Sequence, residues 1–116
     1  MAVKLRRGDI ILVDLDPVIG SEQGNIRPAL VIQNDTGNEY SPTTIVAPVT
    51  SKDYSRQFPT NVEIDKNNSP LKEKSTILFN QIRVVDKSRI IKVYGKLSVS
   101  KMKEVDEAIM ISLGLE

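Results

Sequence analysis

The sequence contains no cysteine, no histidine and no tryptophan among its 116 residues. Without cysteine, the chain can form no disulfide scaffold, no thiolate metal site and no cysteine nucleophile. Without histidine, it lacks both the usual acid–base residue of neutral pH and a two-histidine metal site, which disfavours a metal hydrolase. Any catalysis would depend on carboxylates, hydroxyls, tyrosines, lysines or arginines, and we expect no metal and no other cofactor.

Long apolar runs are also missing. No run approaches the roughly 20 residues that a membrane-spanning helix needs. The basic segment at residues 1–7 leads into Gly8 and Asp9 rather than into the apolar centre of a signal peptide. We therefore expect a cytoplasmic protein that does not engage a membrane.

A strong net charge is absent as well. The formal charge is only +1, so a site for a polyanion would have to arise from the local placement of basic residues. Apolar residues make up 40% of the chain and charged residues 27%, which is an ordinary folded composition. With no repeat, low-complexity tract or linker, residues 1–116 are expected to form a single domain.

Short segments rich in β-branched residues predict a mainly β protein. We expect strands at residues 9–15, 27–33, 43–49, 60–64 and 90–94, with residues 76–85 forming either one strand or two strands separated by a bulge near Asn80. Pro48 indicates a sheet edge or a bulge late in the third strand. Residues 34–38 are dense in turn formers, and residues 86–89 have the pattern of a short helical turn.

The last segment changes to helical periodicity. Its apolar residues recur three or four positions apart, at Val99, Met102, Val105, Ile109 and Leu113. Ser98 or Ser100 can cap the start of this helix and Gly114 its end. Several short strands followed by one helix predict a small, strongly bent sheet or barrel with the helix packed on it.

The stretch from residue 20 to residue 35 combines a polar loop with a buried strand. A glycine-flanked loop at residues 20–24 precedes Arg27 and Pro28, and the apolar run 29–32 follows. Pro28 restricts the backbone next to Arg27, whose permanently charged guanidinium offers five donors. Such a group at a rigid strand edge is well suited to hold a phosphate.

Short motifs spread over nearly the whole chain carry a family likeness. In order they are Arg7-Gly8-Asp9-Ile10, Asp14-Leu15-Asp16-Pro17, Gly20-Ser21-Glu22-Gln23-Gly24, Arg27-Pro28-Ala29-Leu30-Val31-Ile32-Gln33-Asn34-Asp35, Gln81-Ile82-Arg83 and Val105-Asp106-Glu107-Ala108. One fragment alone would be weak, but the ordered set at matching spacing resembles the MazF (PemK-like) toxins.

The resemblance implies a fold, an activity and partners. MazF-like proteins have a small SH3-like barrel, which they share with the gyrase-poisoning toxin CcdB. They are homodimeric endoribonucleases of type II toxin–antitoxin systems that cut single-stranded RNA at short sequences without a metal, and a cognate MazE-like antitoxin inhibits them. In the family the catalytic arginine follows the glycine-flanked loop and the catalytic threonine ends the third strand, which matches Arg27 and Thr50.

Metal-free RNA cleavage by the 2′-OH needs a base, an acid for the leaving 5′-oxygen, and donors for the charge that builds on phosphorus. Arg27 suits the last role, and Thr50 can either donate to a non-bridging oxygen or orient the 2′-OH. A guanidinium is a poor base because its pKa exceeds about 12. Glu22 is the nearest carboxylate in the sequence, and our hypothesis makes it an auxiliary base or an orienting group.

Substrate recognition is expected to use the loops, because single-stranded RNA is read through exposed bases. The candidate readers of base edges are Ser21, Gln23, Asn34 and Gln81. The candidate stacking residues are Tyr54 and Phe58, with Lys52 and Arg56 beside them for phosphates.

Two other functions are compatible with the sequence. A CcdB-like protein would keep the fold but poison a protein target such as gyrase without catalysis. An SH3-like adaptor would bind peptides, although 4% aromatic residues make an aromatic-lined groove hard to build. The site residues also have structural interpretations, since Arg27 alone could be a surface arginine, Thr50 a strand-end hydroxyl and Glu22 a solvated loop carboxylate.

Overall fold

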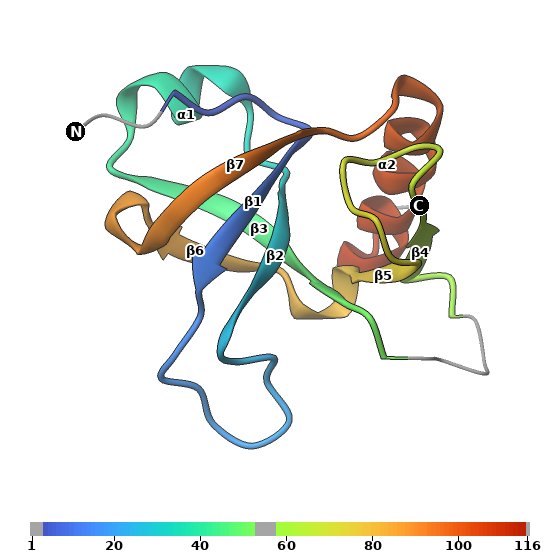
Figure 1. The fold of residues 1–116 in the computed structure, drawn as a ribbon, viewed down its shortest axis with the longest axis horizontal. Helices are drawn as coiled ribbons and strands as arrows, with labels where there is room; N and C mark the ends of the chain where they lie inside the picture. The colour runs from blue at the N-terminus through green and yellow to red at the C-terminus, as the bar shows by residue number, and fades with distance from the viewer. Residues whose placement is uncertain (1–3, 53–57, 116) are drawn as a thin grey trace.

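The computed structural model of the chain describes residues 4–52 and 58–115 (Figure 1). In these residues the strands are β1 (Asp9–Asp14), β2 (Ile26–Val31), β3 (Thr43–Thr50), β4 (Asn61–Ile64), β5 (Ser75–Leu78), β6 (Arg83–Asp86) and β7 (Ile90–Lys96). The α-helices are α1 (Asp35–Tyr40) and α2 (Val99–Leu113), and the short 3₁₀ turns are η1 (Phe79–Gln81) and η2 (Lys87–Arg89). The predicted mainly β fold with a C-terminal helix is confirmed.

The strands pair antiparallel in the order β4-β5-β3-β2-β1-β7, and β6 also pairs with β3. One edge of the long strand β3 pairs with β2. Along its other edge, the first half of β3 pairs with β6 and its last residues pair with β5. Figure 1 shows β3 crossing the molecule from α1 to the region where β4, β5 and α2 lie. The end of β3 is thus the point at which the sheet turns.

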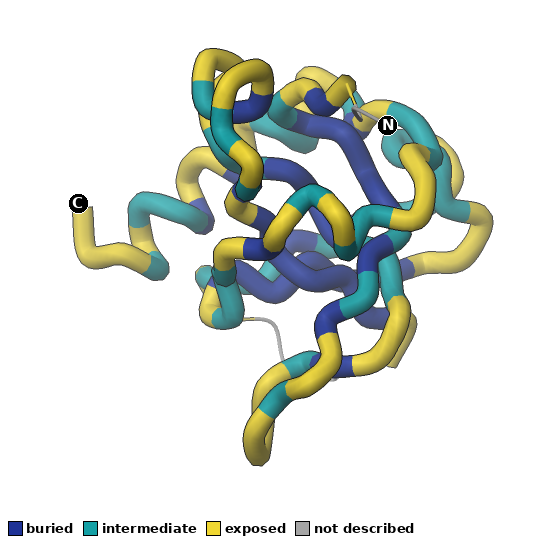
Figure 2. The backbone as a smooth tube through the Cα atoms, turned by 90° about the vertical axis from the view of Figure 1, so that its left-hand side faces the viewer, coloured by how far each residue is buried: buried dark blue, intermediate teal, exposed yellow. Residues whose placement is uncertain are grey.

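Apolar residues cover both faces of the central strands. In β1, Ile10 belongs to one hydrophobic cluster, which includes the inner side of α2, whereas Ile11 and Val13 belong to the other. Neighbouring residues of β2 divide in the same way, with Leu30 on one side and Ala29 on the other. Burial on both faces explains why these strands read as continuous apolar runs rather than as an alternating pattern. Figure 2 shows this buried centre surrounded by exposed loops.

Helix α2 has the predicted limits. The Ser98 hydroxyl accepts a hydrogen bond from the Lys101 N–H at 3.2 Å, and Gly114 ends the helix with φ of +69°, a left-handed conformation that glycine adopts without strain. Val105 is fully buried, and Met102 and Ile109 pack against the same cluster. The predicted apolar stripe is exposed at its ends, at Val99 and Leu113. No helix in the described ranges is long and apolar enough to cross a bilayer.

The segment predicted to be a turn at residues 34–38 is instead the start of α1, so that prediction was wrong. Asn34 caps this helix by accepting a hydrogen bond from the Gly37 N–H at 2.8 Å. The buried side chain of Asn38 donates to the Gln33 carbonyl at 2.9 Å and accepts from the Thr44 hydroxyl at 2.7 Å. Turn-forming residues therefore build a helix here because their side chains are bonded to the adjoining strands.

Two open questions about the strands are also resolved. Residues 76–85 form two strands, β5 and β6, and they are separated by the turn η1 rather than by a bulge. Pro48 is buried in the central strand β3 and not at a sheet edge. On the side of β3 that faces β6 and β5, the pairs Val46–Arg83 and Val49–Ile77 leave Pro48 unpaired, so its missing N–H costs no strand hydrogen bond there.

A charged contact fixes the N-terminal segment to α1. The Arg7 N–H donates to the Asp35 carboxylate at 2.6 Å, and this hydrogen bond holds the pKa of Asp35 below its usual value. The Arg7 guanidinium reaches the other way and forms a 2.7 Å ion pair with Asp106 of α2. Arg7 therefore links the first strand region to both helices.

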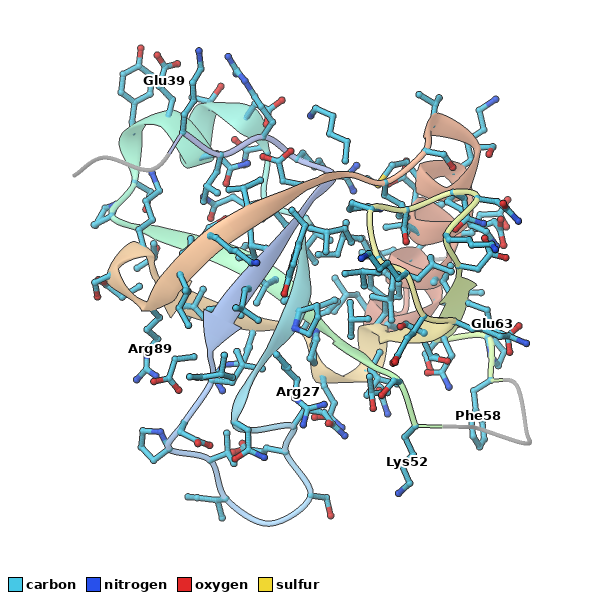
Figure 3. The ribbon with its side chains drawn as sticks, in the orientation of Figure 1. Arg27, Glu39, Lys52, Phe58, Glu63 and Arg89 are labelled. Atoms are coloured by element: carbon cyan, nitrogen blue, oxygen red, sulfur yellow. The ribbon has the colours of Figure 1, made fainter. Side chains whose placement is uncertain are left out.

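Asn38 gives a direct test of this arrangement. Asn38→Ala leaves the Thr44 hydroxyl and the Gln33 carbonyl without partners in a buried site, so we expect the free energy of unfolding in urea to fall by about 2 kcal/mol. Glu39→Ala, on the same helix but with an exposed side chain (Figure 3), is the matched control and should change it by less than about 0.5 kcal/mol. Equal effects of the two substitutions would contradict the assigned role of Asn38.

Candidate active site

A cavity of about 640 Å³ opens where β2 begins and β3 ends. Arg27 comes from β2, Thr50 and Lys52 come from the end of β3 and the residues after it, and Lys72 and Glu73 come from the connection between β4 and β5. Figure 3 shows Arg27 and Lys52 at the same edge of the molecule. The cavity thus gathers side chains from three separate parts of the chain.

The pairing of β2 with β3 brings the two predicted catalytic residues together. The register pairs Leu30 with Ala47 and Ala29 with Pro48. Continued by two residues on each strand, it sets Arg27 opposite Thr50, and directly opposite residues have Cβ atoms about 4.5–5.5 Å apart. Both residues line the cavity, which is the arrangement that this register predicts.

Arg27 is half-buried, and one hydrogen bond fixes its guanidinium group. Its Nε donates to the Gly24 carbonyl at 2.7 Å. Within the described residues, its two terminal nitrogens make no hydrogen bond or ion pair. Because the partner is a neutral carbonyl, the guanidinium keeps its full charge and has four N–H donors left for an anion in the cavity.

Thr50 is buried with its hydroxyl at the cavity wall. Its Oγ1 accepts a hydrogen bond from the Lys52 N–H at 3.1 Å, in the turn that follows β3. Since a hydroxyl has one proton and two lone pairs, this contact leaves the Thr50 proton free to donate into the cavity. Arg27 and Thr50 can therefore donate to the same anion from two neighbouring strands.

The charges of the cavity favour a phosphate. Three cations, Arg27, Lys52 and Lys72, face a single carboxylate, Glu73, among the described residues that line it. Lys52 also lines an adjoining hollow of about 340 Å³, where Lys74 forms a 3.8 Å ion pair with Glu63, so the clear excess of positive charge lies in the Arg27 cavity. No group of three or more Asp, Glu, His or Cys side chains in the described residues could hold a metal ion.

Lys72 and Glu73 were not among the predicted site residues. In the sequence they belong to a short run of alternating charges, Lys72-Glu73-Lys74, which by itself indicates only a solvated connection. They reach the cavity because they immediately precede β5, which pairs with the end of β3 and in turn with β4. This contact depends on the turn of the sheet and leaves no local signal in the sequence.

Glu22 lies apart from the Arg27 cavity. It lines a second cavity of about 450 Å³ together with Gln23, Gln81 and Arg83. Its Oε1 accepts a hydrogen bond from the Ile19 N–H at 2.7 Å, which closes the tip of the loop between β1 and β2. The carboxylate nearest to Arg27 in the sequence is thus engaged in shaping this loop.

The predicted readers of base edges lie in different surroundings. The Gln81 amide contacts the loop between β1 and β2: its Oε1 accepts from the Gln23 N–H at 2.6 Å, and its Nε2 donates to the Ser21 carbonyl at 3.4 Å. Asn34 is the cap of α1, which Figure 1 shows at the end of the molecule opposite to this loop. Of the four predicted readers, Gln23 and Gln81 line the second cavity, whereas Ser21 and Asn34 line neither of the two larger cavities.

The structure describes two of the four residues predicted to stack on bases or to bind phosphates, Lys52 and Phe58. Phe58 is exposed and lines neither of the two larger cavities, whereas Lys52 lines the Arg27 cavity. Tyr54 and Arg56 lie outside the described residues. Arg83 donates to the Leu15 carbonyl at 2.9 Å and so supports the base of the loop.

Residues 6–113 match the model of the PemK-like, MazF-like toxins of type II toxin–antitoxin systems. The chain belongs to this family. It is also 56% identical, over 111 residues, to an endoribonuclease MazF of Staphylococcus saprophyticus, covering 96% of this chain and 92% of the relative.

Solved structures support the MazF-like fold. A MazF from Deinococcus radiodurans superposes with a TM-score of 0.82 at 24% sequence identity, covering 97% of this chain and 98% of that chain. A mycobacterial endoribonuclease solved in complex with its cognate antitoxin gives a TM-score of 0.80 at 20% identity, covering 97% of each chain. Despite this low identity, the barrel and its helix agree over nearly their full length.

Gly24 provides a test of how the loop is built. A Cβ at Gly24 would lie 2.7 Å from Asp16 Oδ1, which already accepts from the Asn25 N–H at 2.8 Å. We expect Gly24→Ala to displace this peptide and to raise amide hydrogen exchange at Gln23 and Asn25 about tenfold, equivalent to about 1.4 kcal/mol.

Ser21→Ala is the control for this prediction. It removes an exposed hydroxyl from the same loop without a change of backbone conformation, whereas alanine at Gly20 would be strained by the φ of +59°. Exchange at Gln23 should therefore remain as in the wild type. Unchanged exchange in Gly24→Ala would contradict the packing described for Gly24.

Proposed function

We propose that this MazF-like protein is a sequence-specific, metal-independent endoribonuclease toxin that cuts single-stranded RNA, including mRNA, at the cavity of Arg27 and Thr50. The 56% identity to an endoribonuclease MazF over nearly the whole chain supports the activity. One observation supports the site: Arg27, whose terminal nitrogens make no hydrogen bond or ion pair within residues 4–52 and 58–115, lines one basic cavity together with Thr50.

In the proposed reaction the 2′-oxygen attacks the adjacent phosphorus and the bond from phosphorus to the 5′-oxygen breaks. The products are a 2′,3′-cyclic phosphate and a free 5′-OH, and the leaving 5′-oxygen takes its proton from solvent water. Arg27 donates to the non-bridging oxygens and stabilises the charge that grows on them in the transition state. Thr50 donates from the neighbouring strand and fixes the orientation of the phosphate.

The proton of the 2′-OH needs an acceptor, and we assign this role to Glu73. Its support is location, because it is the one carboxylate among the described residues that line the cavity with Arg27 and Thr50. Glu22 is a weaker candidate, since it lines another cavity and accepts a hydrogen bond from the Ile19 N–H. A general base must come within hydrogen-bond reach of the hydroxyl that it deprotonates, so this assignment requires bound RNA to bring its 2′-OH to Glu73.

RNA binding is proposed to extend beyond the reacting phosphate. Lys52 and Lys72 line the cavity and can bind neighbouring phosphates. Ser21 and Gln23 of the loop between β1 and β2 are the proposed readers of base edges, and Tyr54, Arg56 and Phe58 remain proposed contacts of the RNA.

Three further proposals concern assembly and location. An antitoxin of the MazE type is the proposed inhibitor, in agreement with the Deinococcus radiodurans MazE–MazF complexes, which share this fold. A homodimer is the proposed assembly, and the exposed partners Ile45 of β3 and Val84 of β6 offer an apolar face for it. The proposed location is the cytoplasm.

The first test of the proposal is cleavage itself. Purified protein incubated with a long natural RNA in EDTA should produce specific cuts, mapped by their 5′ ends. Arg27→Ala should lower kcat/KM by roughly 10²–10³-fold or more, because a donor to the transition-state charge is lost. Arg6→Ala, which removes an exposed guanidinium away from the cavity, should cut at the wild-type rate.

Other outcomes of this assay point elsewhere. Intact RNA at high enzyme concentration would contradict the endoribonuclease proposal and favour a CcdB-like poison of a protein target. Cuts that persist in Arg27→Ala, or that disappear equally in Arg6→Ala, would contradict the assigned site.

The proton acceptor is tested by two matched substitutions. Glu73→Gln should lower kcat by roughly 10²–10⁴-fold, the usual contribution of a general base, and should remove the acidic limb of the profile of kcat against pH. Glu22→Gln retains an oxygen that can accept from Ile19 and should keep that limb. The opposite result, with the limb lost only in Glu22→Gln, would return the role to Glu22.

A further inference from the structure

Gln81 lines the second cavity, and its side chain makes an unusual set of contacts. It lies in the turn η1, and both ends of its side-chain amide bind the backbone of the loop between β1 and β2. Oε1 accepts from the Gln23 N–H at 2.6 Å and Nε2 donates to the Ser21 carbonyl at 3.4 Å. The amide thus binds this loop much as a neighbouring strand would, across about 60 positions of sequence.

The same loop segment holds the guanidinium of Arg27. Gly24 follows Gln23 directly, and its carbonyl accepts the 2.7 Å hydrogen bond from Arg27 Nε. Gly24 is buried, and an added Cβ would lie 2.7 Å from both Asp16 and Val18, so this part of the loop is closely packed. A continuous path of contacts therefore leads from Gln81 through Gln23 and Gly24 to Arg27.

We propose that Gln81 is a positioning residue for Arg27 and that it acts by holding the loop of residues 20–25 in place. The inference rests on the proposed RNA cleavage at Arg27. In this role the Gln81 amide is occupied by the loop backbone and does not read a base edge. Because Nε is the anchored atom, a shift of the Gly24 carbonyl rotates both terminal nitrogens away from the phosphate.

The expected effect is on the rate rather than on RNA binding. The loss of the Gln81 contacts leaves Arg27 present but less well oriented, and a misplacement of about 1 Å can cost about 10²-fold in rate. Gln81 lies outside both hydrophobic clusters and is only half-buried, so leucine, of similar size, should leave the fold intact. The phenotype of Gln81→Leu is thus separable from unfolding.

The kinetic test is a double-mutant cycle in the full chain. Gln81→Leu should lower kcat by roughly 10–10²-fold with little change in KM. In an Arg27→Ala background it should cause no further loss, because its effect passes through Arg27. Gln81→Glu keeps an oxygen for the Gln23 N–H and should recover part of the rate. Additive losses, or an effect on KM alone, would overturn the proposal and indicate direct contact with RNA.

A second readout does not depend on cleavage. Hydrogen exchange by NMR of the Gln23 amide and of Arg27 Nε–H should be faster in Gln81→Leu than in the wild type, while the melting temperature stays the same. Unchanged exchange at both sites would overturn the positioning role. If the wild-type protein cut no RNA, the proposed function would be contradicted. The exchange measurement would still show whether Gln81 restrains Arg27.

Discussion

The pairing of β2 with β3 is the constraint on which the site depends. These strands carry apolar residues on both faces, so each side chain has an assigned hydrophobic cluster. A slip of one residue would move each side chain from its own cluster into the other, where the shapes and volumes do not match, so the packing of both faces favours one register. Continued by two residues beyond Ala29 and Pro48, that register places Arg27 opposite Thr50, and both residues line the cavity. The geometry proposed for catalysis is therefore determined by packing several residues away from the cavity.

Local charge placement compensates for a chain that is almost neutral overall. Arg27, Lys52 and Lys72 converge on one cavity, while the arginines at the other side of the loop between β1 and β2, Arg83 and Arg89, are bound to backbone carbonyls. The three arginines near this loop thus act in two ways. Arg83 and Arg89 bind carbonyls with their terminal nitrogens and brace the loop, whereas Arg27 is bound through Nε and, within the described residues, keeps its terminal nitrogens for a ligand.

The sequence predicts those features that have a local or periodic signal. The strands and α2 follow from β-branched runs, helical spacing and the caps at Ser98 and Gly114, and the cavity contains the Arg27–Thr50 pair that the family likeness indicated. Helix α1 was missed because its stability comes from the buried Asn38, a contact with other elements. Glu73 was missed for the same reason, since the turn of the sheet brings it to the cavity. Asn34 and Gln81 were hard to interpret because an amide suits a base edge and a backbone group equally well.

The anchor of Arg27 is a backbone carbonyl, and this has a consequence for how such a protein can change over evolutionary time. A carboxylate anchor could be deleted by one codon change, but every residue at position 24 would supply a carbonyl. Substitutions can therefore change the direction of that carbonyl, which depends on the path of the loop, but they cannot remove the carbonyl itself. Substitutions in the loop can then alter the RNA that is accepted while the group that orients the guanidinium persists, as long as the backbone returns to the same place at Gly24.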